Sequence, residues 1–96
     1  MKITKEEFTN SLLESLSPEG LSLPQQALWY DGKEDWKKAH DLIDRLHDPV
    51  SAHIHAYLHR KEGDTWNADY WYSKANKKRP NISLKEEWEQ LVEAYI

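Results

Sequence analysis

The sequence predicts a small all-α domain of six short antiparallel helices. Apolar residues recur at helical spacing in six segments, and no segment shows the alternating apolar and polar pattern of a strand. Capping residues and prolines mark where the segments begin, and the connections between them are only a few residues long. Short connections favour antiparallel packing of neighbouring helices, so we expect residues 1–96 to form a single helical domain.

The first expected helix spans residues 4–16 and serves as an N-terminal capping helix. Thr4 and Glu7 form a capping box, in which each side chain accepts a hydrogen bond from a backbone amide at the start of the helix. Four apolar residues follow at helical spacing: Phe8, Leu12, Leu13 and Leu16. The sequence Ser-Pro-Glu-Gly at residues 17–20 then ends the helix.

Residues 24–47 are expected to form a first helical hairpin. Pro24 suits the first turn of its first helix, which ends near Gly32. Asp35 caps its second helix. That helix carries the clearest amphipathic stripe of the chain: Trp36, Ala39, Ile43 and Leu46.

Residues 49–76 are expected to form a second hairpin, followed by a C-terminal capping helix over residues 84–95. Asp48 and Pro49 begin the hairpin, while Gly63 and Asp64 form its turn. Its second helix has apolar residues around much of its circumference, including the aromatic pair Trp66 and Tyr70, so we expect that helix to lie centrally. A second capping box, Ser83 with Glu86, begins the last helix.

The two hairpins are related to each other in sequence. Setting "KEDWKKAHDLI" at residues 33–43 beside "KEGDTWNADYW" at residues 61–71, with one gap, aligns Asp35 with Asp64 and Ala39 with Ala68. The hairpins therefore follow one another at an interval of 29 residues.

The second hairpin resembles a known repeat family. The residues that carry the resemblance are Gly63, Asp64, Ala68, Tyr72, Lys74, Ala75 and Pro80. Their spacing is similar to that of the second helix and exit of tetratricopeptide and Sel-like repeats, and the segment also resembles one in small bacterial proteins without an assigned activity. The resemblance implies stacked helical hairpins whose groove binds a peptide or a partner protein.

The same resemblance implies where that groove lies, because in tetratricopeptide repeats the first helix of each hairpin faces the concave side. The candidate partner-binding residues are Trp29, Tyr30, Tyr57, Arg60 and Lys61. Arg60 and Lys61 would pair with a carboxylate, so an acidic or C-terminal peptide segment is the expected ligand. The leading functional hypothesis is therefore a non-enzymatic protein-interaction module or scaffold.

Composition and motifs weigh against several other functions. The net charge of −4 gives no positive field that would attract nucleic acid. The sequence contains no run of 18 apolar residues, so we expect no membrane span. We find no nucleophile elbow and no glycine-rich phosphate loop, so we expect neither an enzyme nor a bound cofactor. The opening MKITKEEFTN lacks the apolar run of a signal peptide, which predicts a cytoplasmic protein.

Two histidines leave an alternative function open. His55 and His59 stand at i and i+4, a spacing at which two imidazoles on one helical face can share Zn²⁺ or Ni²⁺. Sequence spacing fixes no third ligand, so no metal site is predicted. A small-molecule or metal-binding protein using these histidines and the tyrosines stays an alternative, as does a purely structural homodimer.

Overall fold

The computed structural model describes residues 3–96, and residues 1 and 2 of the predicted domain lie outside the described part. Its helices are α1 (Lys5–Ser11), α2 (Leu23–Gly32), α3 (Trp36–Ile43), α4 (Pro49–Lys61), α5 (Thr65–Lys74) and α6 (Leu84–Tyr95). No strand occurs among residues 3–96, so the predicted all-α class is confirmed. Within this described part, no helix combines the length and the apolar character that a membrane span requires.

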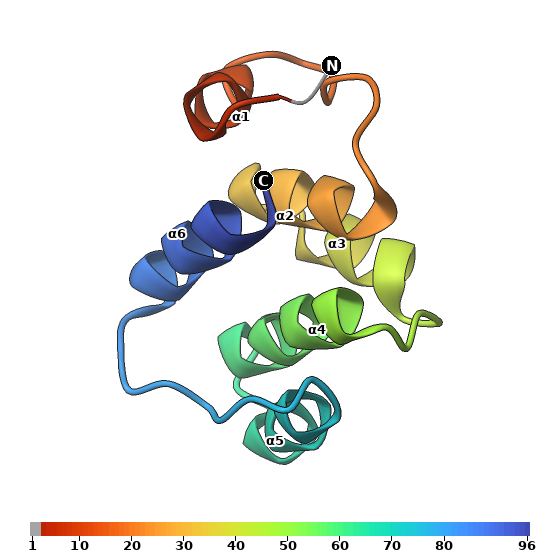
Figure 1. The fold of residues 1–96 in the computed structure, drawn as a ribbon, viewed down its shortest axis with the longest axis vertical. Helices are drawn as coiled ribbons and strands as arrows, with labels where there is room; N and C mark the ends of the chain where they lie inside the picture. The colour runs from red at the N-terminus through yellow and green to blue at the C-terminus, as the bar shows by residue number, and fades with distance from the viewer. Residues whose placement is uncertain (1–2) are drawn as a thin grey trace.

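The central element is α4, which packs against α2, α3, α5 and α6. In Figure 1, α1 lies at the top of the molecule and α5 at the bottom, with α4 between α5 and the remaining helices. Eight of the 13 residues of α4 are buried. Our expectation that the second helix of the second hairpin, α5, would be central is therefore wrong, because α5 packs on α4 with one face and exposes Trp66 and Tyr70 on another.

The helices begin where the capping residues predict. The Thr4 and Glu7 capping box is present at α1, and the Asp48 carboxylate accepts a hydrogen bond of 3.0 Å from the Ser51 amide at the start of α4. A capping box at α2, formed by Ser22 and Gln25, was not predicted. Each cap satisfies amide groups that have no partner within the helix, which fixes where the chain turns into helix.

The first helix is shorter than predicted, because it ends at Ser11 rather than near Leu16. The indole of Trp29 donates to the Ser11 hydroxyl at 3.0 Å, and the Lys33 ammonium donates to the backbone carbonyls of Leu12 and Glu14. The Lys33 ammonium thus satisfies the Leu12 carbonyl, which a longer helix would have bonded internally, and the Trp29 indole holds the hydroxyl of the last residue of α1. The side chain of Leu16, which the helical spacing had placed on the apolar face, is consequently exposed.

Two apolar clusters hold the helices together. The larger one fills the space among α1, α2, α3, α4 and α6. The smaller one is an interface of small residues between α4 and α5, with Trp71 and Tyr72 at its side: Ala52, Ala56, Ala68 and Ala75. Alanines allow two helix backbones to approach closely, so α4 and α5 form a tightly packed pair.

Candidate functional site

The structure places two of the five sequence-predicted partner-binding residues in the core. Trp29 is 1% exposed and Tyr57 is 2% exposed, while the side chain of Tyr30 is half-buried against Trp29. Trp29 and Tyr57 therefore offer almost no area to a partner. The structure brings Tyr57 and Lys61 together at Asp31 of α2, and it directs Arg60 toward α6.

Asp31 is a buried carboxylate that joins α2 to α4. Its Oδ2 accepts a hydrogen bond of 2.7 Å from the Tyr57 hydroxyl, and its Oδ1 accepts one of 2.9 Å from the Lys61 ammonium. Burial and the negative charge of Asp31 both raise the pKa of Tyr57, which keeps that hydroxyl protonated as a donor. The charge of Lys61 is thus compensated by a carboxylate of the same chain.

Glu87 plays the corresponding role between α4 and α6. Its Oε1 accepts a hydrogen bond of 2.9 Å from Arg60, and its Oε2 accepts one of 2.5 Å from the Tyr72 hydroxyl. Arg60 also donates to the backbone carbonyl of Ile82 in the connection that precedes α6. Arg60 and Lys61 therefore act as internal ties between helices, and neither side chain is presented to solvent as an unpaired cation.

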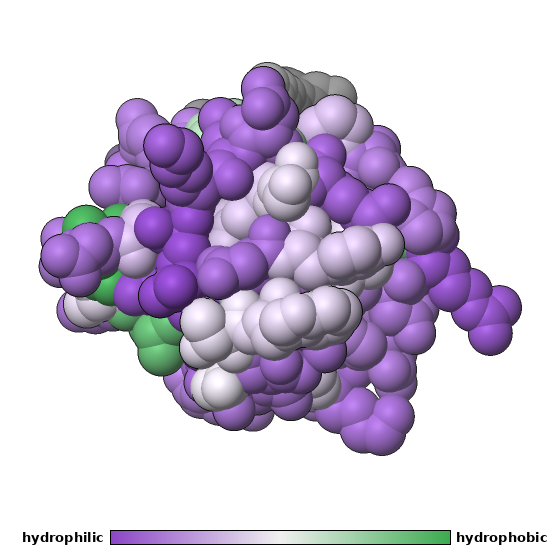
Figure 2. Space-filling view, turned by 90° about the horizontal axis from the view of Figure 1, so that it is seen from below, coloured by the Kyte–Doolittle hydropathy of each residue, from purple (hydrophilic) through white to green (hydrophobic). Residues whose placement is uncertain are grey.

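An aromatic surface lies instead on the outer side of α5. Trp66 is 75% exposed and Tyr70 is 47% exposed, yet their rings stack with centroids 6.1 Å apart and planes at 11°. The Lys74 ammonium lies 5.2 Å from the centroid of the Tyr70 ring. We call these three residues, at successive intervals of four along the helix, the α5 face. Figure 2, viewed from the α5 side, shows pale residues gathered at the centre of a mostly hydrophilic surface.

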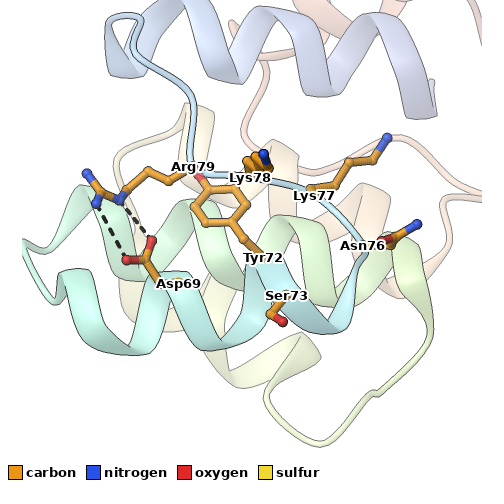
Figure 3. A pocket seen from close by; sticks show the side chains of 7 residues that line it. All are labelled: Asp69, Tyr72, Ser73, Asn76, Lys77, Lys78 and Arg79. Atoms are coloured by element: carbon orange, nitrogen blue, oxygen red, sulfur yellow. Dashed lines mark hydrogen bonds and ion pairs between the residues drawn. The ribbon is translucent and has the colours of Figure 1, made fainter.

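A basic groove of about 530 Å³ adjoins the α5 face. Its lining residues are Asp69, Tyr72, Ser73, Asn76, Lys77, Lys78 and Arg79. Figure 3 shows that the first three of these side chains rise from α5, while the basic ones belong to the connection that follows it. Arg79 donates to the Asp69 carboxylate at 2.8 Å, whereas neither Lys77 nor Lys78 forms an ion pair within residues 3–96.

The sequence contained a signal for the α5 face but not for its exposure. Trp66 and Tyr70 stand at i and i+4, which places them on one side of a helix. Whether that side faces the core depends on which neighbouring helices pack against α5, and sequence spacing does not contain that information. The basic residues Lys77, Lys78 and Arg79 that follow α5 are consecutive in the sequence.

The two histidines of the alternative hypothesis are also brought near a third. His55 and His59 are buried on α4, and the partly exposed His40 of α3 lies beside them. His47 and His53 are not part of this group.

Comparison of the chain with protein-family models, with curated proteins and with solved structures found no match in any of the three. A candidate function therefore depends on the geometry of the residues described above.

Proposed function

We propose that this protein is a non-enzymatic interaction module that binds an extended peptide segment of a partner protein on the α5 face. The single observation that carries the proposal is the stacked and exposed pair of Trp66 and Tyr70, with Lys74 beside it. The tetratricopeptide-like groove, lined by the first helices of the hairpins, is not the surface we propose. The residues expected to line it are occupied by contacts within the chain.

Stacking makes the two rings a favourable contact surface. Single exposed apolar side chains are common on proteins, but adjoining aromatic rings form a continuous apolar area. Tryptophan and tyrosine also lose little rotamer entropy when they are covered, which explains their enrichment among residues that dominate binding energy. The mutual stacking of Trp66 and Tyr70 restricts their rotamers before a partner arrives.

The charges beside the rings favour an acidic ligand. Lys74 lies at one end of the α5 face, and Lys77 and Lys78 extend the positive charge into the basic groove. A helix rises about 1.5 Å per residue, so the α5 face extends about 12 Å from Trp66 to Lys74. An extended peptide advances about 3.3 Å per residue and covers this length with about four residues. The expected ligand has an apolar residue or proline over the rings and an acidic residue about four positions away.

A peptide selection tests this proposal directly. Random peptides displayed on phage are selected on the wild-type protein, and the enriched peptides are titrated against three variants by fluorescence anisotropy. Trp66→Ala should weaken binding by at least about tenfold, the effect expected of a residue that dominates an interface. Lys74→Glu should weaken binding more at low salt than at high salt, because the contact is electrostatic.

The matched control is Leu16→Ala, which removes an equally exposed apolar side chain outside the α5 face. We expect this variant to bind the selected peptides like the wild type. If no acidic peptide is enriched, or if Trp66→Ala binds as well as the wild type, the proposal is wrong. A dimer that dissociates in Trp66→Ala would assign the α5 face to a second copy of the chain, which is the structural homodimer alternative.

A further inference from the structure

Three imidazoles from two helices converge at the junction of α3 and α4. His40 belongs to α3, and His55 and His59 belong to successive turns of α4. One ring nitrogen from each residue lies within 4.8 Å of the others, and Nε2 of His40 is 3.0 Å from Nε2 of His55. We call these three residues the histidine cluster.

These separations suit a tetrahedral metal ion. Zinc binds imidazole nitrogen at about 2.0–2.1 Å, so two ligands of a tetrahedral site lie about 3.3 Å apart. The 3.0 Å between His40 and His55 is close to that value, and a ring nitrogen of His59 lies within 4.8 Å of both. From this geometry we propose that His40, His55 and His59 bind a divalent transition-metal ion, with zinc the best suited and water as the fourth ligand.

The surroundings orient the rings of the cluster. The indole of Trp36 stacks on His40 with centroids 4.9 Å apart, and it is itself fixed by a hydrogen bond of 2.7 Å to the Leu58 carbonyl. The indole of Trp71 stacks on His55 with centroids 4.0 Å apart. Ligands that are held in place before the metal arrives lose less conformational entropy on binding.

A carboxylate orients the third ring. The Glu62 carboxylate lies 2.6 Å from Nδ1 of His59. With its proton on Nδ1, His59 keeps the lone pair of Nε2 for a metal ion, which is the arrangement found at many zinc sites. Glu62→Gln should therefore weaken metal binding without removing a ligand.

Two carboxylates lie near the histidine cluster. Asp41 and Asp44 lie beside His40, with a ligand oxygen of each within 4.8 Å of the imidazole nitrogen. Because His40 is partly exposed, an ion can reach the cluster from the acidic surface.

The lack of a partner for one ring nitrogen of His55 sets the expected strength of metal binding. Nδ1 of His55 is buried and has no hydrogen-bond partner within residues 3–96. If His55 binds the metal through Nε2, its Nδ1 carries the proton and has no acceptor for it. The loss of such an outer partner typically weakens metal binding about 10–100-fold, so we expect weaker binding than at a structural zinc site.

Calorimetric titration of the chelator-treated protein with Zn²⁺ tests the site. We expect one saturable site per chain, and Co²⁺ in its place should give the intense visible absorption of a tetrahedral complex. His40→Ala and His59→Ala should each weaken binding by at least about tenfold, since each removes one of three protein ligands. The matched control is His53→Asn, which removes a histidine of α4 that bonds Tyr95 instead and should leave binding unchanged.

Several results would overturn the metal site. These are the absence of saturable binding to the wild type, binding that His40→Ala leaves unchanged, and one ion per two chains with dimerisation. The decisive variant is His40→Ala, because its partly exposed ring can be removed with less effect on folding than the buried His55. The wild-type Co²⁺ spectrum gives an independent answer even if every histidine variant unfolds.

Discussion

Glu34 and Gly63 occupy equivalent positions, 29 residues apart, in the turns that join α2 to α3 and α4 to α5. Both have positive φ values, 63° and 88°. Each precedes the aspartate that caps the next helix, Asp35 or Asp64. The aspartate amide then bonds a carbonyl five residues earlier, at 2.9 Å in both turns. The two hairpins therefore share one turn geometry. The gapped sequence alignment was wrong at this point, because it set Glu34 opposite Glu62 and left Gly63 without a counterpart. Membership of the tetratricopeptide family stays a prediction.

Placing a glycine at residue 34 and removing the glycine at residue 63 should change the stability of the domain in opposite directions. A residue with a Cβ is disfavoured at positive φ, whereas glycine is not. Glu34→Gly should stabilise the domain by about 0.5–1 kcal/mol, less any small contribution from the exposed pair with Lys61. Gly63→Ala should destabilise it by about 1 kcal/mol through backbone strain alone, because its added Cβ would meet no atom within 4 Å.

Urea unfolding measures both changes. Glu34→Gln serves as the control, because it removes the charge of Glu34 and keeps the backbone preference. If Glu34→Gly is less stable than Glu34→Gln, strain at this turn is not the controlling factor.

Removing the buried carboxylate of Glu87 should cost far more than removing an exposed one. Glu87→Ala leaves Arg60 and the Tyr72 hydroxyl without their partner between α4 and α6. Breaking a buried ion pair from one side typically costs about 3–5 kcal/mol, and we expect a loss of that size in urea unfolding. Glu89→Ala, at an exposed position of the same helix, should change stability by less than about 0.5 kcal/mol. Similar losses in the two variants would contradict the role given to Glu87.

A charge in the alanine interface should unfold the domain. Ala68 is fully buried between α4 and α5, beside Ala52 and Ala56. Ala68→Glu would place a carboxylate where no water or cation reaches it, at an expected cost of about 3 kcal/mol or more. Circular dichroism should show a large fall in melting temperature, whereas Ser73→Glu, on the exposed side of α5, should melt close to the wild type. A native-like melting temperature of Ala68→Glu would show that α4 and α5 pack differently.

The helices were predictable because their signals are local. Caps such as Asp48 and Ser83 act on amides within three residues of themselves, so sequence alone reveals where α4 and α6 begin. The end of α1 was not predictable in this way. It depends on hydrogen bonds from Trp29 and Lys33, whose positions follow from how α2 packs.

Which residues come together at the candidate sites depends more on the packing of the helices than the helix boundaries do. Sequence spacing paired His55 with His59, but His40 joins them only because α3 packs beside α4. Likewise, the sequence predicted that Arg60 and Lys61 would be available to a ligand. In the structure they pair with Glu87 and Asp31, which belong to other helices. Long-range pairs of this kind leave no periodic pattern in one sequence.

The stability of the domain should fall as the pH decreases, and His53 should account for part of the fall. His53 of α4 has its Nδ1 2.7 Å from the hydroxyl of Tyr95 in α6, and the Tyr72 ring of α5 packs near it. Burial, with a smaller effect from the positive charge of Lys77, lowers the pKa of His53 from 6.5 to about 4. Between these two values the unfolded chain binds a proton that the folded chain does not.

The contribution of His53 is therefore fully present above pH 6.5 and is lost as the pH falls from 6.5 toward about 4. His53→Asn keeps a polar group near the Tyr95 hydroxyl and cannot take up this proton, so its stability should depend less on pH across the same window. Urea unfolding of both proteins at a series of pH values, with a chelator present, measures the difference. The partly exposed ring of His40 and the buried ring of His55 act in the same direction in both proteins, so the comparison isolates His53. Identical pH dependence of the two proteins would show that His53 takes up its proton as readily in the folded state as in the unfolded chain.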